Sequence, residues 1–166
     1  MDFNRIISHL FFFPWAMRRA LSAADLRELG NAIQASEASH RGELRFAVEG
    51  ALDVGQLWSG MTARERAIDL FSSLRIWDTA ENNGVLIYLL LADRQVEIIA
   101  DRGIHQKTGP EVWAAICSSM QKSFQRGDFK GGLLDGLRDV SAILDRDYPA
   151  DGKNPDELPN EPVVLR

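Results

Sequence analysis

The spacing of apolar positions switches between strand-like alternation and helix-like periodicity along the chain, which is typical of an α/β protein. Residues 43–49 alternate strictly between apolar and polar side chains, as expected of a strand that lies at a sheet edge or is covered on one face. The continuous apolar run 85–91 predicts a buried strand, and residues 96–100 predict a second strand. Because only residues 92–95 separate these two strands, we expect an antiparallel hairpin at the centre of the sheet.

Helix-like periodicity predicts four helices that cover this sheet. Start signals support two of them, since Ser22 is a good N-cap, and Thr62 and Glu65 have the spacing of a capping box. The expected helices span residues 22–39, 62–75, 110–126 and 128–147. The predicted fold class is therefore α/β, with a small mixed sheet covered by helices.

The two ends of the chain differ in composition from the middle, and this divides the chain into three parts. Residues 1–21 form an apolar and basic arm, and residues 22–148 carry the predicted helices and strands. Residues 149–166 are rich in proline and acidic residues, as in a disordered tail. We therefore expect one folded domain between two appendages.

The N-terminal arm combines an apolar run, Leu10 to Met17, with the adjacent pair Arg18 and Arg19. The run is far shorter than the ~20 residues of a spanning helix, and it lacks a clear signal-peptide cleavage pattern. Two interpretations stay open. The arm either folds onto the domain, which we favour, or makes peripheral membrane contact through residues 1–19, with aromatic side chains in the headgroup region and arginines on anionic lipid.

Composition narrows the class of protein and its compartment. The 166 residues are 45% hydrophobic and 26% charged, which suits one ordinary core. The net charge of −5 argues against nucleic acid as a partner and suits a cation or a basic protein. Cys117 is the sole cysteine, so an intrachain disulfide or a cysteine-based zinc site is excluded. We expect a cytoplasmic protein, peripheral at most at the inner membrane, without a signal peptide or transmembrane helix.

Polar side chains gather at the expected strand ends, where open α/β sheets bind ligands. Carboxylate and amide oxygens suit Ca²⁺ or Mg²⁺, whereas guanidinium and glycine backbone suit a phosphate or a similar ligand. The expected metal ligands are Asp78, Glu81, Asn82 and Asp101. The expected contacts to another ligand are Asn83, Gly84, Arg102 and Gly103. A structural role in turns and salt bridges stays open for all of them.

A longer set of ordered motifs resembles one protein family. The central part reads Phe71-x4-Ile76-Trp77-Asp78-Thr79-x2-Asn82-Asn83-Gly84-Val85-Leu86-Ile87-Tyr88, then Ala92-Asp93-Arg94-x-Val96-Glu97-Ile98 and Ala100-Asp101-Arg102-Gly103-Ile104. It is preceded by Gly42-Glu43-Leu44-Arg45 and followed by Trp113, Met120 and Phe124-x2-Gly127-x3-Gly131-Gly132-Leu133. This order of motifs, over residues 22–148, resembles the TPM domain family.

The resemblance implies an α/β/α sandwich. It also implies binding of calcium or another divalent metal, as in some members, and acid phosphatase activity, as in a thylakoid relative. Where the family has Asp-Asn-Gly before the central strand, this chain has Asn82-Asn83-Gly84, so one carboxylate ligand is missing. Relatives often carry a signal peptide and a C-terminal membrane helix, and this sequence shows neither.

Two functions from different classes follow. We expect a non-catalytic binding or accessory module that works with a protein partner at or near the membrane, with a bound Ca²⁺ or Mg²⁺ as an option. The alternative is a metal-dependent, acid-phosphatase-like hydrolase. Signatures of other enzymes are absent from the sequence, which has no Walker loop, no GxGxxG, no GxSxG and no HExxH.

Overall fold

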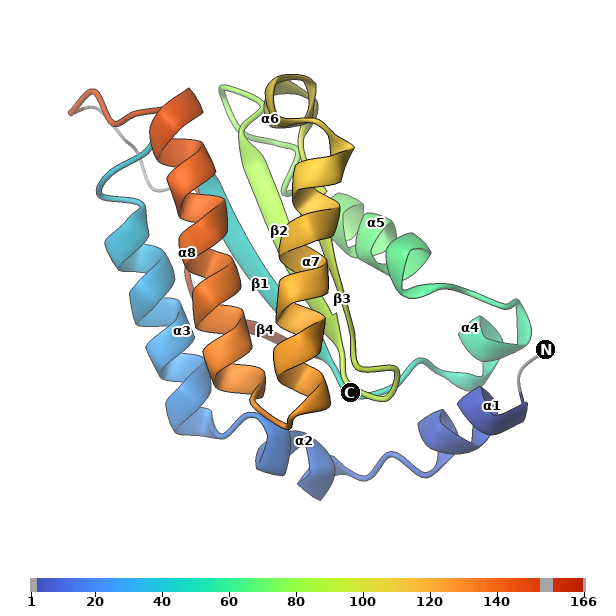
Figure 1. Ribbon diagram of the computed structural model, residues 1–166. Coiled ribbons are helices and arrows are strands. Elements are labelled where there is room, and N and C mark those ends of the chain that lie inside the picture. Colours follow the sequence, from blue (N-terminus) through green and yellow to red (C-terminus); the bar gives the residue numbers. More distant parts are fainter. Residues whose placement is uncertain (1–2, 153–156, 166) are drawn as a thin grey trace.

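The computed structural model describes residues 3–152 and 157–165, which form a mixed four-stranded sheet with helices on both faces (Figure 1). The strands are β1 (Glu43–Glu49), β2 (Gly84–Leu90), β3 (Gln95–Ala100) and β4 (Val163–Leu165), in the order β3-β2-β1-β4. β1 pairs in parallel with both β2 and β4, whereas β2 and β3 form an antiparallel hairpin. The expected α/β fold with a mixed sheet and this hairpin is confirmed.

Eight helices occur in the described residues. They are α1 (Phe3–Leu10), α2 (Pro14–Ala20), α3 (Ala23–Ser36), α4 (Val54–Trp58), α5 (Ala63–Ser73), α6 (Arg102–Thr108), α7 (Pro110–Gln125) and α8 (Phe129–Asp147). α3, α7 and α8 cover one face of the sheet, and α5 covers the other (Figure 1). The four helices expected from the sequence correspond to α3, α5, α7 and α8.

β2 is buried along its whole length because its side chains alternate between two apolar cores. Its odd-numbered positions join the core under α3, α7 and α8, namely Val85, Ile87 and Leu89. Its even-numbered positions join the core under α5, namely Leu86, Tyr88 and Leu90. The continuous apolar run in the sequence therefore reflects a strand covered on both faces.

One expectation about the sheet is wrong, and the reason is β4. β1 lies between β2 and β4 instead of at an edge, whereas β3 of the hairpin forms the opposite edge of the sheet. The acids that made β1 resemble a half-exposed strand are buried, with Glu43 1% and Glu49 3% exposed. Glu43 Oε2 accepts hydrogen bonds from the N–H groups of Glu157 and Leu158 at 3.3 and 3.0 Å. A buried carboxylate with partners cannot be told from an exposed one in a sequence.

The C-terminal segment also differs from expectation, because residues 157–165 pack on the domain instead of forming a disordered tail. Leu158 is buried in the core under α5, and β4 extends the sheet beside β1. The proline-rich composition hides this arrangement, since the segment docks on residues more than a hundred positions earlier in the chain. The other tail residues, 153–156 and 166, lie outside the described residues.

Short helices account for the remaining differences. α1, α2, α4 and α6 lie outside the four helices expected from the sequence. On α5 the buried positions are Ala63, Ala67 and Leu70, whereas Ile68 is 49% exposed. Two of these three buried positions are alanines, so the side of α5 that faces the core is formed mainly by small side chains.

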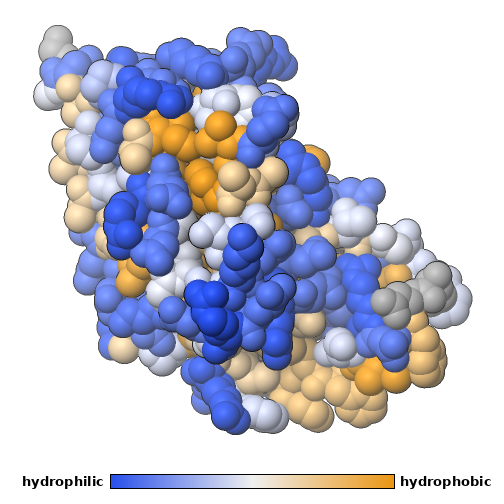
Figure 2. All heavy atoms as spheres, in the orientation of Figure 1, coloured by the Kyte–Doolittle hydropathy of each residue, from blue (hydrophilic) through white to orange (hydrophobic). Residues whose placement is uncertain are grey.

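The N-terminal arm, α1 and α2, lies against the end of the sheet that carries the hairpin turn (Figure 1). Its inner side chains contact the domain, in agreement with the first of the two interpretations. Apolar side chains gather on its outer side, at the lower right of the molecule in Figure 2. In residues 3–152 and 157–165, no helix has both the length and the apolar character that crossing a bilayer requires.

A buried histidine makes the stability of the fold pH-dependent. His40 is 0% exposed, and burial lowers its pKa from 6.5, although the nearby charge of Asp145 acts in the opposite direction. Below pH 6.5 the unfolded chain therefore binds a proton that the native state excludes. We expect the free energy of unfolding, measured in urea, to fall as the pH drops below 6.5, and to fall less steeply for His40→Gln. Equal slopes for the two proteins would contradict this.

Candidate functional site

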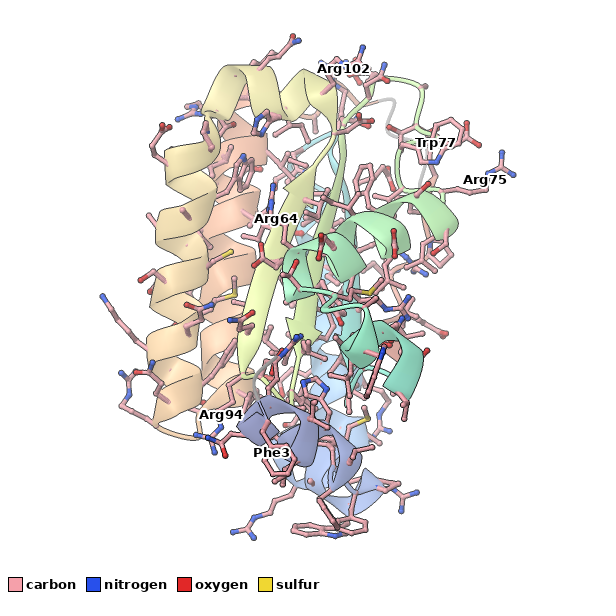
Figure 3. The ribbon with its side chains drawn as sticks, turned by 90° about the vertical axis from the view of Figure 1, so that its right-hand side faces the viewer. Phe3, Arg64, Arg75, Trp77, Arg94 and Arg102 are labelled. Atoms are coloured by element: carbon pink, nitrogen blue, oxygen red, sulfur yellow. The ribbon has the colours of Figure 1, made fainter. Side chains whose placement is uncertain are left out.

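A hollow of about 450 Å³ lies where β2 begins and β3 ends. It is lined by Trp77, Glu81, Asn82, Asp101, Arg102, Gly103 and Gln106. These residues come from the loop between α5 and β2 and from the start of α6, at the top of Figure 3. Most of the site residues expected from the sequence thus share one hollow, and the exceptions are Asp78, Asn83 and Gly84.

Asn83 and Gly84 hold the loop in place and do not line the hollow. Asn83 is 2% exposed, and its N–H donates to the hydroxyl of Thr79 at 3.1 Å. Its carbonyl accepts from the N–H of Glu43 at 3.1 Å, which ties the loop to β1. Gly84 is required by a close approach, because a Cβ at this position would overlap the carbonyl oxygen of Ile76. The geometry gives both residues a structural role.

Asp101 is the central side chain of the hollow. Its Oδ1 accepts a hydrogen bond from the N–H of Arg102 at 2.6 Å, which caps α6. Its Oδ2 is buried, and within residues 3–152 and 157–165 it has no hydrogen-bond partner. Leaving a buried carboxylate oxygen without a donor costs free energy, so the hollow offers a strong acceptor to a ligand.

Trp77 forms one wall of the hollow. Its Nε1 donates to the carbonyl of Ser72 at 3.3 Å, which orients the indole ring. The residue is 48% exposed. An aromatic surface therefore lines the same hollow as Asp101, and Figure 3 shows Trp77 at the same end of the molecule as Arg102.

The four expected metal ligands do not assemble into one cluster. Asp78 forms an ion pair with Arg75 at 2.5 Å and lies outside the hollow. Glu81 forms an ion pair with Arg41 at 2.6 Å. In the described part of the chain, no group of three or more His, Cys, Asp or Glu side chains is placed to hold a metal ion. Ca²⁺ and Mg²⁺ are held chiefly by several charged oxygens, so the residues present do not fit such a site.

Two contributors to the site are not apparent in the sequence. Gln106 reaches the hollow from α6, and the signal for this helix is Asp101, a preferred N-cap residue followed closely by Ile104. Arg41 precedes β1 and holds the carboxylate of Glu81. The contact between Arg41 and Glu81 cannot be predicted from a local sequence pattern, because the two residues are 40 positions apart.

The family assignment follows from a comparison with known sequences. A model of the TPM domain matches residues 17–143, from within α2 to within α8. The chain belongs to the TPM domain family. The strands β1, β2 and β3 and the loop that lines the hollow all lie inside the matched region, whereas α1 and β4 lie outside it.

Solved structures of similar proteins support the TPM fold. The BA42 protein of the psychrophilic bacterium Bizionia argentinensis is 30% identical, with a TM-score of 0.76 over 87% of this chain and 94% of that one. The N-terminal domain of a protein from P. gingivalis is 21% identical, with a TM-score of 0.62 over 77% and 78% of the two chains, and shares the fold alone. No curated protein matches the sequence.

Proposed function

We propose that this TPM-domain chain is a non-catalytic binding module that holds a basic side chain of a protein partner in the hollow around Asp101. The observation that carries this proposal is the buried Asp101 Oδ2 atom, which has no hydrogen-bond donor among the described residues. Folded proteins leave few buried polar atoms unpaired. A donor supplied by a ligand would satisfy this oxygen.

The surroundings of Asp101 favour an organic cation over a metal ion. A Cβ added to Gly103 would lie 2.7 Å from the carbonyl oxygen of Asn82 and 3.4 Å from that of Glu81, so backbone acceptors are near. Trp77 adds an exposed ring, and aromatic faces attract ammonium and guanidinium groups. The Asp101 carboxylate, carbonyl oxygens and an aromatic face suit a lysine or arginine side chain. The net charge of −5 also favours a basic partner.

Metal-dependent phosphate hydrolysis is the alternative function. Arg102 lies on the rim of the hollow, and a guanidinium matches a phosphate in a bidentate way. The Asp101 carboxylate would repel the same phosphate, however, and hydrolysis assisted by metal needs a ligand set that these side chains do not supply. The non-catalytic module is therefore the better-supported proposal.

Asp101→Asn and Arg102→Gln are expected to change the affinity for an oligolysine peptide in opposite directions. Asparagine keeps the size and the capping ability of Asp101 but loses its charge, so the affinity should fall about tenfold, the effect of one charge-assisted hydrogen bond. Arg102→Gln removes a repelling charge from the rim, so the affinity should rise by roughly two- to threefold. Isothermal titration calorimetry with the wild type and both variants measures these changes.

Matched controls lie on an exposed part of α8. Asp139→Asn and Arg138→Gln make the same chemical changes there and should leave the affinity unaltered. Titrations with inorganic phosphate, CaCl₂ and MgCl₂ complete the experiment. The proposal is overturned if the wild type does not bind oligolysine, or if the wild type binds Ca²⁺ saturably and Asp101→Asn does not. Phosphate binding that weakens in Arg102→Gln would support the alternative.

A further inference from the structure

Helix α1 turns its polar side chains toward the domain, opposite to the usual orientation of a surface helix. Arg5 donates through Nε to Asp93 Oδ2 at 3.0 Å and through Nη2 to the carbonyl of Met61 at 2.8 Å. His9 is buried, and its Nδ1 accepts from the N–H of Leu52 at 3.0 Å. With Nδ1 as an acceptor, the ring proton lies on Nε2, which donates to Asp93 Oδ1 at 2.9 Å. The inner side of α1 is therefore polar and hydrogen-bonded.

The outer side of the arm is apolar. Large hydrophobic side chains exposed there are Phe3 (72%), Ile7 (40%), Leu10 (56%), Phe11 (65%), Phe13 (51%) and Trp15 (61%). We call these six side chains the arm face. Figure 2 shows the apolar surface that they contribute over α1 and the segment joining it to α2. Because exposed apolar clusters are unfavourable in water, such a surface marks a site that a partner covers.

Basic side chains border the arm face. Arg18 and Arg19 are exposed in the last turn of α2, and Arg94 is exposed in the hairpin turn. Trp15, Arg19 and Arg94 line one hollow of about 560 Å³. Residues 3–20 contain three arginines and no acidic residue, although the whole chain carries a net charge of −5. This end of the molecule is thus basic and apolar on an otherwise acidic protein.

We propose that the arm face binds the surface of a lipid bilayer that contains anionic headgroups. The aromatic and aliphatic side chains enter the boundary between headgroups and acyl chains, and the bordering arginines meet the anionic lipids. A second copy of this chain is a poor occupant, because two facing arms would bring their arginines together. In Figure 3, Phe3 and Arg94 lie at one end of the molecule and Trp77 and Arg102 at the other, so the bound protein keeps the hollow around Asp101 away from the lipid.

The arm face is already formed on the folded domain, and this lowers the entropic cost of binding. Phe12, between the two helices, packs against the core, and its ring lies 2.8 Å from the place of a Cβ on Gly50. The hydrogen bonds of Arg5 and His9 fix α1 in the same way. No segment has to fold on the membrane, in contrast to a disordered amphipathic peptide.

Vesicle flotation of the full chain tests this proposal. The wild type should float with phosphatidylcholine vesicles that contain phosphatidylserine, float much less with pure phosphatidylcholine, and detach as salt is added. The triple variant Phe11→Ser, Phe13→Ser, Trp15→Ser should lower the ratio of bound to free protein by roughly tenfold, because it removes the apolar area that enters the bilayer. The pair Arg18→Gln, Arg19→Gln should lower it by roughly tenfold on anionic vesicles alone.

Control variants place the same kinds of change elsewhere. Ile68→Ser with Val112→Ser alters aliphatic side chains that are 49% and 40% exposed on α5 and α7, and Arg75→Gln with Arg138→Gln removes two exposed charges. Both control proteins should float like the wild type, and circular dichroism melting verifies that every variant is folded. The proposal is overturned if the wild type floats with neither kind of vesicle, or if the arm variants float as well as the wild type. It is also overturned if the wild type is a dimer that does not bind vesicles and the triple variant is a monomer.

Discussion

Replacing Glu49 by alanine is expected to lower the free energy of unfolding by about 3–5 kcal/mol, because it leaves buried partners without their acceptor. Glu49 is 3% exposed and accepts two hydrogen bonds from Arg66, at 2.8 and 2.9 Å. Tyr88, buried on β2, donates its hydroxyl to the same carboxylate at 2.6 Å. Burial and the bond to Glu49 raise the pKa of Tyr88, so the hydroxyl keeps its proton and remains a donor.

Urea denaturation of the wild type, Glu49→Ala and Asp139→Ala measures this effect. Asp139 is exposed on α8, so its replacement should change the free energy of unfolding by no more than about 0.5 kcal/mol. Glu49→Gln, which keeps the shape and one acceptor, should fall between these two variants. A loss below about 1 kcal/mol for Glu49→Ala, with an unchanged denaturant slope, would show that the carboxylate contributes little.

Gly84→Ala is expected to lower the free energy of unfolding by about 1–3 kcal/mol through overpacking. The added methyl group would overlap the carbonyl oxygen of Ile76 and lie 2.9 Å from the Cγ2 atom of that residue. The loop between α5 and β2 must then shift. Because the carbonyl of Gly84 accepts from the N–H of Asp101 at 2.8 Å, the shift should also weaken binding of oligolysine.

Gly55→Ala is the matched control for this prediction. Gly55 lies in α4, and a Cβ there would meet a single near atom, Asp53 Oδ1, at 3.2 Å. Alanine also favours a helix over glycine, so this control should be close to neutral or slightly stabilising. The melting temperatures of Gly84→Ala and the wild type should therefore differ. Equal melting temperatures, with unaltered affinity for oligolysine, would mean that the loop accommodates the methyl group without loss of stability.

The fold could be predicted where a local sequence pattern is compatible with only one kind of structure. The N-cap at Ser22 and the capping box at Thr62 form as expected and begin α3 and α5. The position of β1 could not be predicted in this way, because Glu43 and Glu49 are buried by partners distant in sequence. The docking of β4 had no local signal for the same reason, since three residues cannot display a periodic pattern.

The candidate site could be predicted in its location but not in its chemistry. Glu81 and Asp101 meet in one hollow because they flank β2 and β3, which pair in the predicted hairpin. Glu81 and Asp78 each form an ion pair with an arginine, and the sequence does not indicate which arginine it is. Arg41 holds Glu81 from 40 positions away. Arg75 reaches Asp78 from a left-handed backbone conformation, with φ of 55°, that nothing in the sequence requires.

The parallel pairing of β4 with β1 decides where a reporter group can be attached. The two strands end side by side, because Gly50, which follows β1, donates its N–H to the carbonyl of Leu165 at 3.3 Å. Gly50 also lies against Phe12 of the arm. A fluorescent protein fused after β4 would start near the arm, so we expect it to hinder the approach of vesicles. A small dye on Arg75→Cys, at the far end of the molecule in Figure 3, avoids this obstruction. The native Cys117 should react slowly with such a dye, since burial raises its pKa to about 11.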